Sequence, residues 1–178
     1  MKIQEDQRID PRIKQIFGAR SGDTASLHRE NPGDATSREQ ILEEVNSEEA
    51  AASRREWEAF LDQCDTEEIA PSTGLAITTR EVASEPDGNI INIQFIRPDG
   101  EDAKPCVYYI HGGGMQSGSC FSGSMRAWGK IVAARGVAVA MVDFRNSVTP
   151  SSVPEIAPFP AGLNDCISGL QWIAANAA

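Results

Sequence analysis

The sequence is poor in histidine, in positive charge and in long apolar runs. Only two of its 178 residues are histidines, and 16 basic side chains stand against 26 acidic ones, which gives a net charge of -10. A surface this negative repels nucleic acids and anionic membranes, so neither is an expected partner. With 40% hydrophobic and 24% charged residues, the composition is that of an ordinary folded domain.

Membrane and redox signals are also missing. No apolar run reaches the roughly 20 residues that cross a bilayer, and residues 1–6 lack the apolar region of a signal peptide. These absences predict a cytoplasmic protein without a membrane span. No C-x-x-C pair occurs, so we expect no metal site, no cofactor and no disulfide scaffold. The cysteines are predicted to be reduced, mostly buried thiols: Cys64, Cys106, Cys120 and Cys166.

Residues 1–70 are predicted to be helical. Residues 10–18 begin with Asp-Pro, a favourable helix start, and carry an apolar stripe, and residues 21–35 read as a loop. Ser37 and Gln40 have the spacing of a capping box, and Ser47 can start a helix that includes Trp57. We expect this segment to pack as a helical cap on residues 71–178.

Residues 71–178 alternate strand and helix patterns. Alternating apolar residues in 75–77 and 91–95 flank a turn at 86–89, which predicts a hairpin at a sheet edge. The apolar runs 106–110 and 137–142 are typical of strands covered on both faces, which implies three layers.

Two helices are predicted beside these strands. The first has a stripe that we expect in the core, and the second begins at Pro160. The stripe of the first is Met125, Trp128 and Val132, and the predicted buried face of the second is Leu163, Ile167, Leu170 and Ala174. Strand, helix, strand is a parallel unit, so the fold class is α/β.

A histidine and three glycines follow the strand at 106–110, where open α/β sheets place ligand sites: His111, Gly112, Gly113 and Gly114. Glycines leave backbone N–H groups unshielded and allow positive φ angles. Such a loop can hold an oxyanion, and an H-G-G-G loop does so in lipases and esterases.

Three motifs carry a resemblance to a known family: residues 109–115, residues 142–146, and residues 158–162 followed by Asp165. In order and spacing, the chain resembles the N-terminal half of the hormone-sensitive-lipase-like α/β-hydrolases, which are serine esterases. Phe144 stands where the family usually has tyrosine, and residues 146–149 depart from its usual leucine-alanine-proline-glutamate. The resemblance implies a mostly parallel sheet with a leading antiparallel hairpin.

The resemblance also implies roles for particular residues. Gly113 and Gly114 would donate N–H groups to the oxyanion, and His111 and Gly112 would shape the loop. Asp143 and Arg145 would brace the strand end, and the position of Asp143 two residues from Arg145 suggests a structural ion pair between them.

The catalytic serine, acid and histidine are not found. No G-x-S-x-G occurs, and Ser117 lies one position late for that motif. We expect Ser117, Ser119, Ser122 and Ser124 to serve turns and a helix N-cap, and His28 to lie on the surface. The triad is therefore expected outside this chain, which alone is predicted to be inactive.

A second polypeptide is the predicted partner, because the strand at 106–110 would otherwise be an open apolar edge that aggregates. The expected substrate is a small uncharged ester, and the whole assembly can form a homo-oligomer. Two alternatives stay open. One is a non-catalytic small-molecule-binding protein on the same scaffold; the other is a nucleotide-binding half-domain, which lacks its third glycine at Ser117.

Overall fold

The structure is a computed structural model that describes residues 5–11, 14 and 36–176. The chain divides into two compact units, Met1–Gln40 and Ile41–Ala178. The predicted helix at 10–18 and the predicted loop at 21–35 lie almost entirely outside the described residues.

The helix starts predicted at Ser37 and at Ser47 are confirmed. Ser37 N donates to Gln40 Oε1 at 2.8 Å, and Gln40 N donates to Ser37 Oγ at 3.3 Å, which is a capping box ahead of α2 (Arg38–Val45). The next helix, α3 (Glu48–Asp62), begins where Ser47 Oγ accepts from Ala50 N at 3.2 Å. These hydrogen bonds satisfy N–H groups that a helix leaves unpaired at its start.

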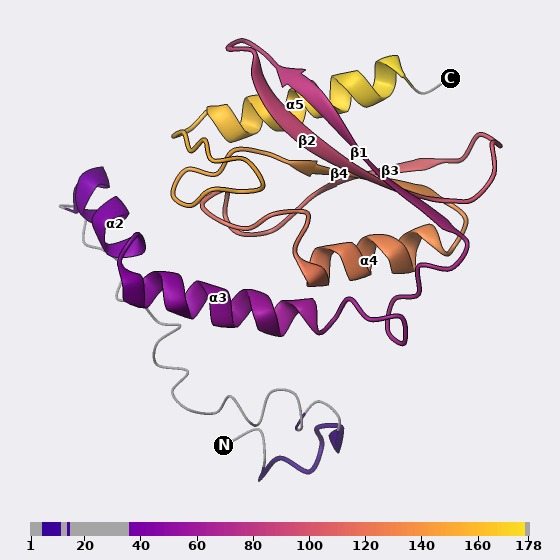
Figure 1. Ribbon diagram of the computed structural model, residues 1–178, viewed down its shortest axis with the longest axis horizontal. Helices are drawn as coiled ribbons and strands as arrows, with labels where there is room; N and C mark the ends of the chain where they lie inside the picture. The colour runs from indigo at the N-terminus through magenta and orange to yellow at the C-terminus, as the bar shows by residue number, and fades with distance from the viewer. Residues whose placement is uncertain (1–4, 12–13, 15–35, 177–178) are drawn as a thin grey trace. The chain divides into compact units, whose positions relative to one another are not determined.

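Four strands form one sheet in the order β1-β2-β4-β3 (Figure 1). They are β1 (Leu75–Ser84), β2 (Asn89–Pro98), β3 (Cys106–Ile110) and β4 (Ala138–Asp143). The predicted hairpin is confirmed, since β1 and β2 pair antiparallel and β1 is an edge strand. β4 pairs antiparallel with β2 and parallel with β3, so the sheet is mixed.

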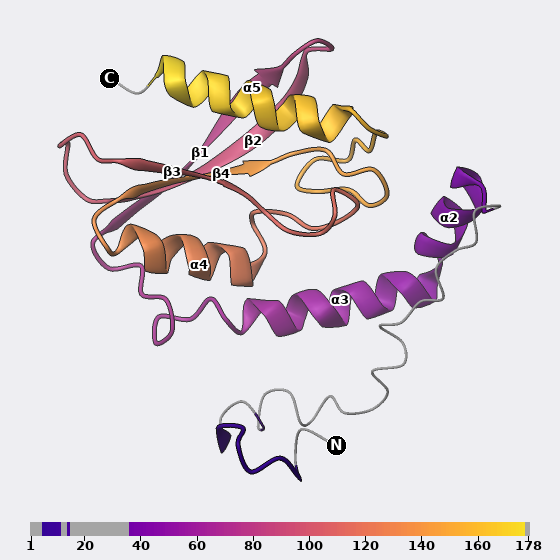
Figure 2. The same ribbon diagram turned by 180° about the vertical axis from the view of Figure 1, so that it is seen from behind.

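Helices cover both faces of the sheet, as predicted. Figures 1 and 2 show α4 (Gly123–Ala133) on one face and α5 (Ala161–Ala175) on the other. Successive side chains of a strand point to opposite faces. On β4, Val139 and Met141 therefore pack in the cluster beside α4, whereas Ala140 and Val142 pack in the cluster beside α5.

The predicted buried face of α5 is wrong. Its predicted members are all exposed: Leu163, Ile167, Leu170 and Ala174. The buried residues of α5 are instead small or polar: Gly162, Asp165, Cys166, Ser168 and Gly169. Small residues let the helix backbone approach the sheet closely, so the apolar stripe points away from it.

Two smaller predictions also need correction. Trp128 is exposed at the surface of α4, although its ring stacks on Tyr109 with centroids 4.2 Å apart. In β3, Cys106, Val107 and Ile110 are exposed, because β3 is the other edge of the described sheet. The open edge predicted at residues 106–110 is therefore confirmed for the part of the chain that the structure describes, but coverage on both faces is not.

The cysteines are free in the structure, and two of the four are buried, fewer than expected. Burial raises the pKa of the Cys166 thiol to about 12 and raises that of Cys120 as well. None of the described helices has the length and apolarity to cross a membrane.

Candidate active site

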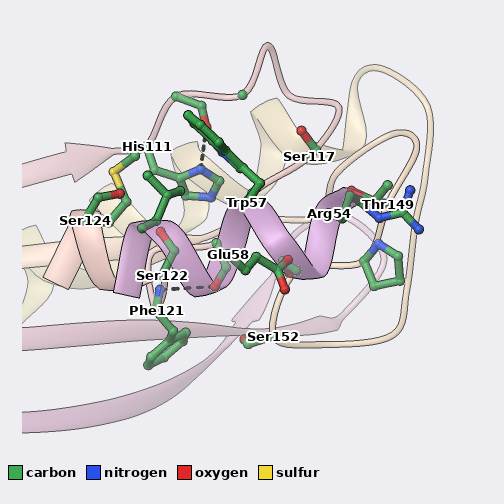
Figure 3. Close-up of a pocket in the computed structure, with 18 of the residues that line it drawn as sticks. Arg54, Trp57, Glu58, His111, Ser117, Phe121, Ser122, Ser124, Thr149 and Ser152 are labelled. Atoms are coloured by element: carbon green, nitrogen blue, oxygen red, sulfur yellow. Dashed lines mark hydrogen bonds between the residues drawn. The ribbon is translucent and has the colours of Figure 1, made fainter. Parts of the chain in front are cut away.

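A pocket of about 680 Å³ opens at the carboxyl end of β3. This is the size of a small-molecule site. His111, Gly112 and Gly113 line one side of it. The other walls come from α3, from the segment 117–125 and from the segment 149–152 (Figure 3).

The glycine loop has backbone angles that only glycine adopts easily. Gly113 has φ 124° and Gly114 has φ 62°. A Cβ built on Gly113 would lie 2.0 Å from the carbonyl oxygen of Ser117, so no other residue fits there without a shift of the backbone. Among the described residues, no acceptor is found for the N–H groups of Gly112, Gly113 and Gly114.

Hydrogen bonds hold this loop against the segment that follows β4. Ser147 N donates to the carbonyl oxygen of Met115 at 2.9 Å, and Thr149 N donates to that of Gln116 at 2.9 Å. Asn146 Nδ2 donates to the carbonyl oxygen of Gly118 at 2.8 Å. Residues 146–149, where the sequence departs from the family pattern, therefore fix the loop.

His111 is buried and supports the backbone of the loop. Its Nδ1 lies 2.8 Å from the carbonyl oxygen of Gly112, and a carbonyl only accepts, so Nδ1 donates. The imidazole stacks on Phe144 with ring centroids 4.3 Å apart. Nε2 has no hydrogen-bond partner among the described residues and lies 3.9 Å from Asp143 Oδ1.

Asp143 connects the two segments beside the glycine loop. Its Oδ1 accepts from Cys120 N at 2.8 Å, and its Oδ2 accepts from Ser152 N at 2.7 Å. The carboxylate is fully buried, and these two charge-assisted hydrogen bonds compensate for its burial.

The suggested ion pair between Asp143 and Arg145 is not found. Arg145 instead binds Asp165 of α5, with Nε to Oδ2 at 2.9 Å and Nη2 to Oδ1 at 2.8 Å. It also reaches Asp87 of the β1–β2 turn, with Nη1 to Oδ2 at 2.6 Å. These hydrogen bonds raise the pKa of Arg145, and the bond from Arg145 lowers the pKa of Asp87. Arg145 thus joins the end of β4 to a helix and a turn.

Comparisons with known proteins find esterases that have a similar structure over this length of chain. The family BD-FAE matches residues 93–178, and no curated protein matches the chain. The solved structure of esterase Est22 is 62% identical with a TM-score of 0.86, and the match covers 99% of this chain and 49% of Est22. Brefeldin A esterase, a bacterial homologue of human hormone sensitive lipase, is 25% identical with a TM-score of 0.70, covering 98% of this chain and 46% of that one.

The chain is similar in sequence and structure to esterases, one of them a bacterial homologue of human hormone sensitive lipase. It spans about half the length of the esterases it matches.

For a chain similar to esterases, the serines in the pocket are the first residues to test as nucleophiles. Ser117, Ser119, Ser122 and Ser124 all line it. Ser119 Oγ accepts from Phe121 N at 3.1 Å, and Ser122 occupies the N-cap position of α4. A serine nucleophile needs a base within hydrogen-bond reach, and no hydrogen bond joins any of the four to a histidine within the described part of the chain. That segment also offers no cluster of three or more metal-ligating side chains.

The pocket also contains residues that sequence reasoning did not assign to a site. Arg54, Trp57, Glu58, Leu61 and Asp62 of α3 line it, as do residues 149–152 after β4. Trp57, which is 48% exposed, projects over the part of the pocket where His111 lies (Figure 3). The sequence predicts that Trp57 lies on a helix, but nothing in the neighbouring residues indicates which loop its side chain faces.

Proposed function

We propose that this chain supplies the oxyanion hole and part of the substrate pocket of a carboxylic-ester hydrolase that works through an acyl-enzyme. One observation carries the proposal: the glycine loop presents N–H groups that have no acceptor among the described residues, beside a pocket of about 680 Å³. Gly113 and Gly114 are the proposed donors. Gly113 lines the pocket directly, whereas Gly114 follows it in the same positive-φ turn.

The proposed chemistry follows from the charge that develops in acyl transfer. When a serine attacks an ester, the carbonyl oxygen becomes an oxyanion, and fixed N–H donors stabilise it by about 3–4 kcal/mol each. Backbone amides do not titrate, so this support does not depend on pH. In this proposal His111 and Gly112 shape the loop, Asp143 and Arg145 brace the end of β4, and none of the four touches the reacting atoms.

The serine, acid and histidine are proposed to lie in the rest of the hydrolase fold, outside this chain, which alone is inactive. Two surfaces support a partner of that kind. The edge of β3 is open, with Ile110 exposed at its end, and the apolar stripe of α5 is uncovered. A strand beside β3 and a layer over α5 would cover both. We also propose that the substrate is a small uncharged ester and that the protein is cytoplasmic. The whole assembly is proposed to form a homo-oligomer.

The test uses a complete assembly, made by expressing this chain together with the part of esterase Est22 that it does not match. One solved structure of Est22 contains p-nitrophenol, so p-nitrophenyl acetate is a suitable first substrate. We expect hydrolysis by the assembly and none by residues 1–178 alone. Hydrolysis by the isolated chain would refute the proposed division of the catalytic residues.

The oxyanion hole is tested by Gly113→Pro, which removes one N–H group. We expect kcat to fall about 100- to 1,000-fold with a smaller change in KM. Gly100→Ala is the control, because Gly100 also has a positive φ of 103° but has open space around its Cβ position and does not line the pocket. Binding of p-nitrophenol by the Gly113 variant shows that its pocket has formed. Full activity in that variant would overturn the assignment of the hole.

A non-catalytic binding protein on the same scaffold is separated from an esterase by the same assembly. Replacing the proposed nucleophile serine in the Est22 part with alanine must abolish hydrolysis if an acyl-enzyme forms. Tight binding of the ester without turnover, with the serine in place, would favour the binding protein.

A further inference from the structure

One end of α3 is fixed to α4 by two aspartates. Asp62 Oδ1 accepts from Gly123 N, the first N–H group of α4, at 3.1 Å. Ser122, the N-cap residue, makes no side-chain cap, so Asp62 takes that role from another helix. A carboxylate at the positive end of a helix dipole is favourable.

Asp65, just beyond the end of α3, makes the second connection. It forms ion pairs with Lys130, at 2.5 Å, and with Arg126, whose Nε lies 2.7 Å from Oδ2. The side chains of Asp65 and Lys130 are only 4% and 6% exposed. Burial alone would raise the pKa of Asp65, but the hydrogen bonds from Lys130 and Arg126 outweigh it and leave the pKa lowered. The carboxylate therefore stays charged at neutral pH.

The two helices touch closely at this point. A Cβ on Gly123 would lie 2.4 Å from the Cα of Asp62 and 2.8 Å from the carbonyl oxygen of Leu61. The position thus tolerates only glycine while α3 keeps its place. We call the group of Asp62, Asp65, Gly123, Arg126 and Lys130 the clamp.

The clamp lies close to the pocket wall along the helix. Trp57 precedes Asp62 by five residues, which is about 7.5 Å along the axis at the usual rise per residue. Trp57 and Leu61 line the pocket that Gly112 and Gly113 line from the other side. A small rotation of α3 about the clamp would therefore change the width of the pocket at Trp57.

We propose that Trp57 limits the size of ester that the pocket accepts. In this proposal Asp62 and Asp65 are positioning residues, because the clamp fixes the end of α3 to α4 and so keeps the Trp57 side chain in its place at the pocket. The inference rests on the proposed esterase function. If the assembly hydrolyses no ester, the proposed esterase function is wrong. If it hydrolyses esters but the variants below leave its preference between long and short esters unchanged, only the inference about Trp57 and the clamp is wrong.

The measured quantity is the ratio of kcat/KM for p-nitrophenyl octanoate to that for p-nitrophenyl acetate, in the complete assembly. Trp57→Ala should raise the ratio at least fivefold, mainly through KM of the octanoate. Asp65→Asn should shift it in the same direction. Glu48→Gln is the matched control, since it removes an exposed ion pair with Arg55 at 2.7 Å on the same helix without touching α4; it should change the ratio less than twofold.

A second readout follows the clamp itself. Cys64 lies between Asp62 and Asp65 and is half-buried, so its alkylation by iodoacetamide, followed by peptide mass, reports how firmly this end of α3 is held. Alkylation should be several-fold faster in Asp65→Asn and unchanged in Trp57→Ala and Glu48→Gln. If Asp65→Asn does not fold, Arg126→Gln removes a half-exposed partner instead. Faster alkylation with wild-type selectivity would overturn the positioning role, and an unchanged ratio in Trp57→Ala would overturn the size limit.

Discussion

The two helices beside the sheet, α4 and α5, differ in what their apolar side chains contact. On α4, Met125 and Val132 pack against the core cluster that contains Met141. On α5, the stripe of Leu163, Ile167 and Leu170 faces away from the sheet, and Leu170 is 51% exposed. One helix therefore uses most of its apolar stripe within this chain, and the other leaves its stripe uncovered.

The difference shows that an apolar stripe alone does not identify the face that packs on a sheet. On α5 that face is identified by close approach and by charge. A Cβ on Gly162 would lie 2.6 Å from the carbonyl oxygen of Arg145, and Asp165 binds the guanidinium of the same residue. Glycine and a buried aspartate within an apolar helix thus point to the sheet, and the stripe opposite them points to a further layer.

Loss of the buried charge on α5 should have the largest effect on stability. Asp165→Ala leaves Arg145 buried with only the half-exposed Asp87 as partner. We expect the complete assembly to lose about 3–5 kcal/mol, measured by urea unfolding. Asp87→Asn is the control and should cost much less, because water reaches that side chain. Equal losses in the two variants would show that burial does not distinguish them.

The two glycines on the packed face of α5 should differ from each other. Gly162→Ala forces a Cβ against a backbone oxygen, whereas Gly169→Ala meets the Tyr108 hydroxyl, which donates to the carbonyl oxygen of Cys166 at 2.8 Å but belongs to a side chain. Overpacking costs about 1–3 kcal/mol, and alanine regains about 1 kcal/mol of helix propensity. We therefore expect Gly162→Ala to lower the melting temperature clearly and Gly169→Ala to lower it less. A lower melting temperature for Gly169→Ala than for Gly162→Ala would contradict the close approach at Gly162.

The exposed stripe of α5 should matter for association more than for the chain itself. Leu170→Ala truncates one exposed side chain of this stripe and removes no member of the two core clusters. It should weaken binding of the complementing half about tenfold, which corresponds to about 1.4 kcal/mol. Ile131→Ala on α4 is the matched control, since Ile131 is also exposed. The fraction of the complementing half that copurifies with each coexpressed variant compares the two affinities. Equal affinity of the two variants for the complementing half would show that the stripe does not contact it.

Local patterns predicted more of this molecule than long-range contacts did. Short segments of the sequence predict the capping box at Ser37, the start of α3 at Ser47 and the glycine loop at 111–114. No short segment predicts the partners of Arg145, because Asp87 precedes it by 58 positions and Asp165 follows it by 20. The approach of Trp57 to the pocket depends in the same way on contacts between distant segments, which one sequence does not reveal.

The smallest expected effect concerns pH and the outer partner of Arg145. The pKa of Asp87 is lowered chiefly by its hydrogen bond from Arg145. A carboxyl whose pKa is lower in the folded state adds stability above its unfolded pKa, about 3.9, and that contribution is lost as the pH falls through the folded value. The melting temperatures of the wild type and Asp87→Asn should therefore differ at pH 7 and converge below about pH 4. The side chain is half-exposed, so salt should reduce the difference, and a difference that grows on acidification would mean that Asp87 is protonated more readily in the folded protein than in the unfolded chain.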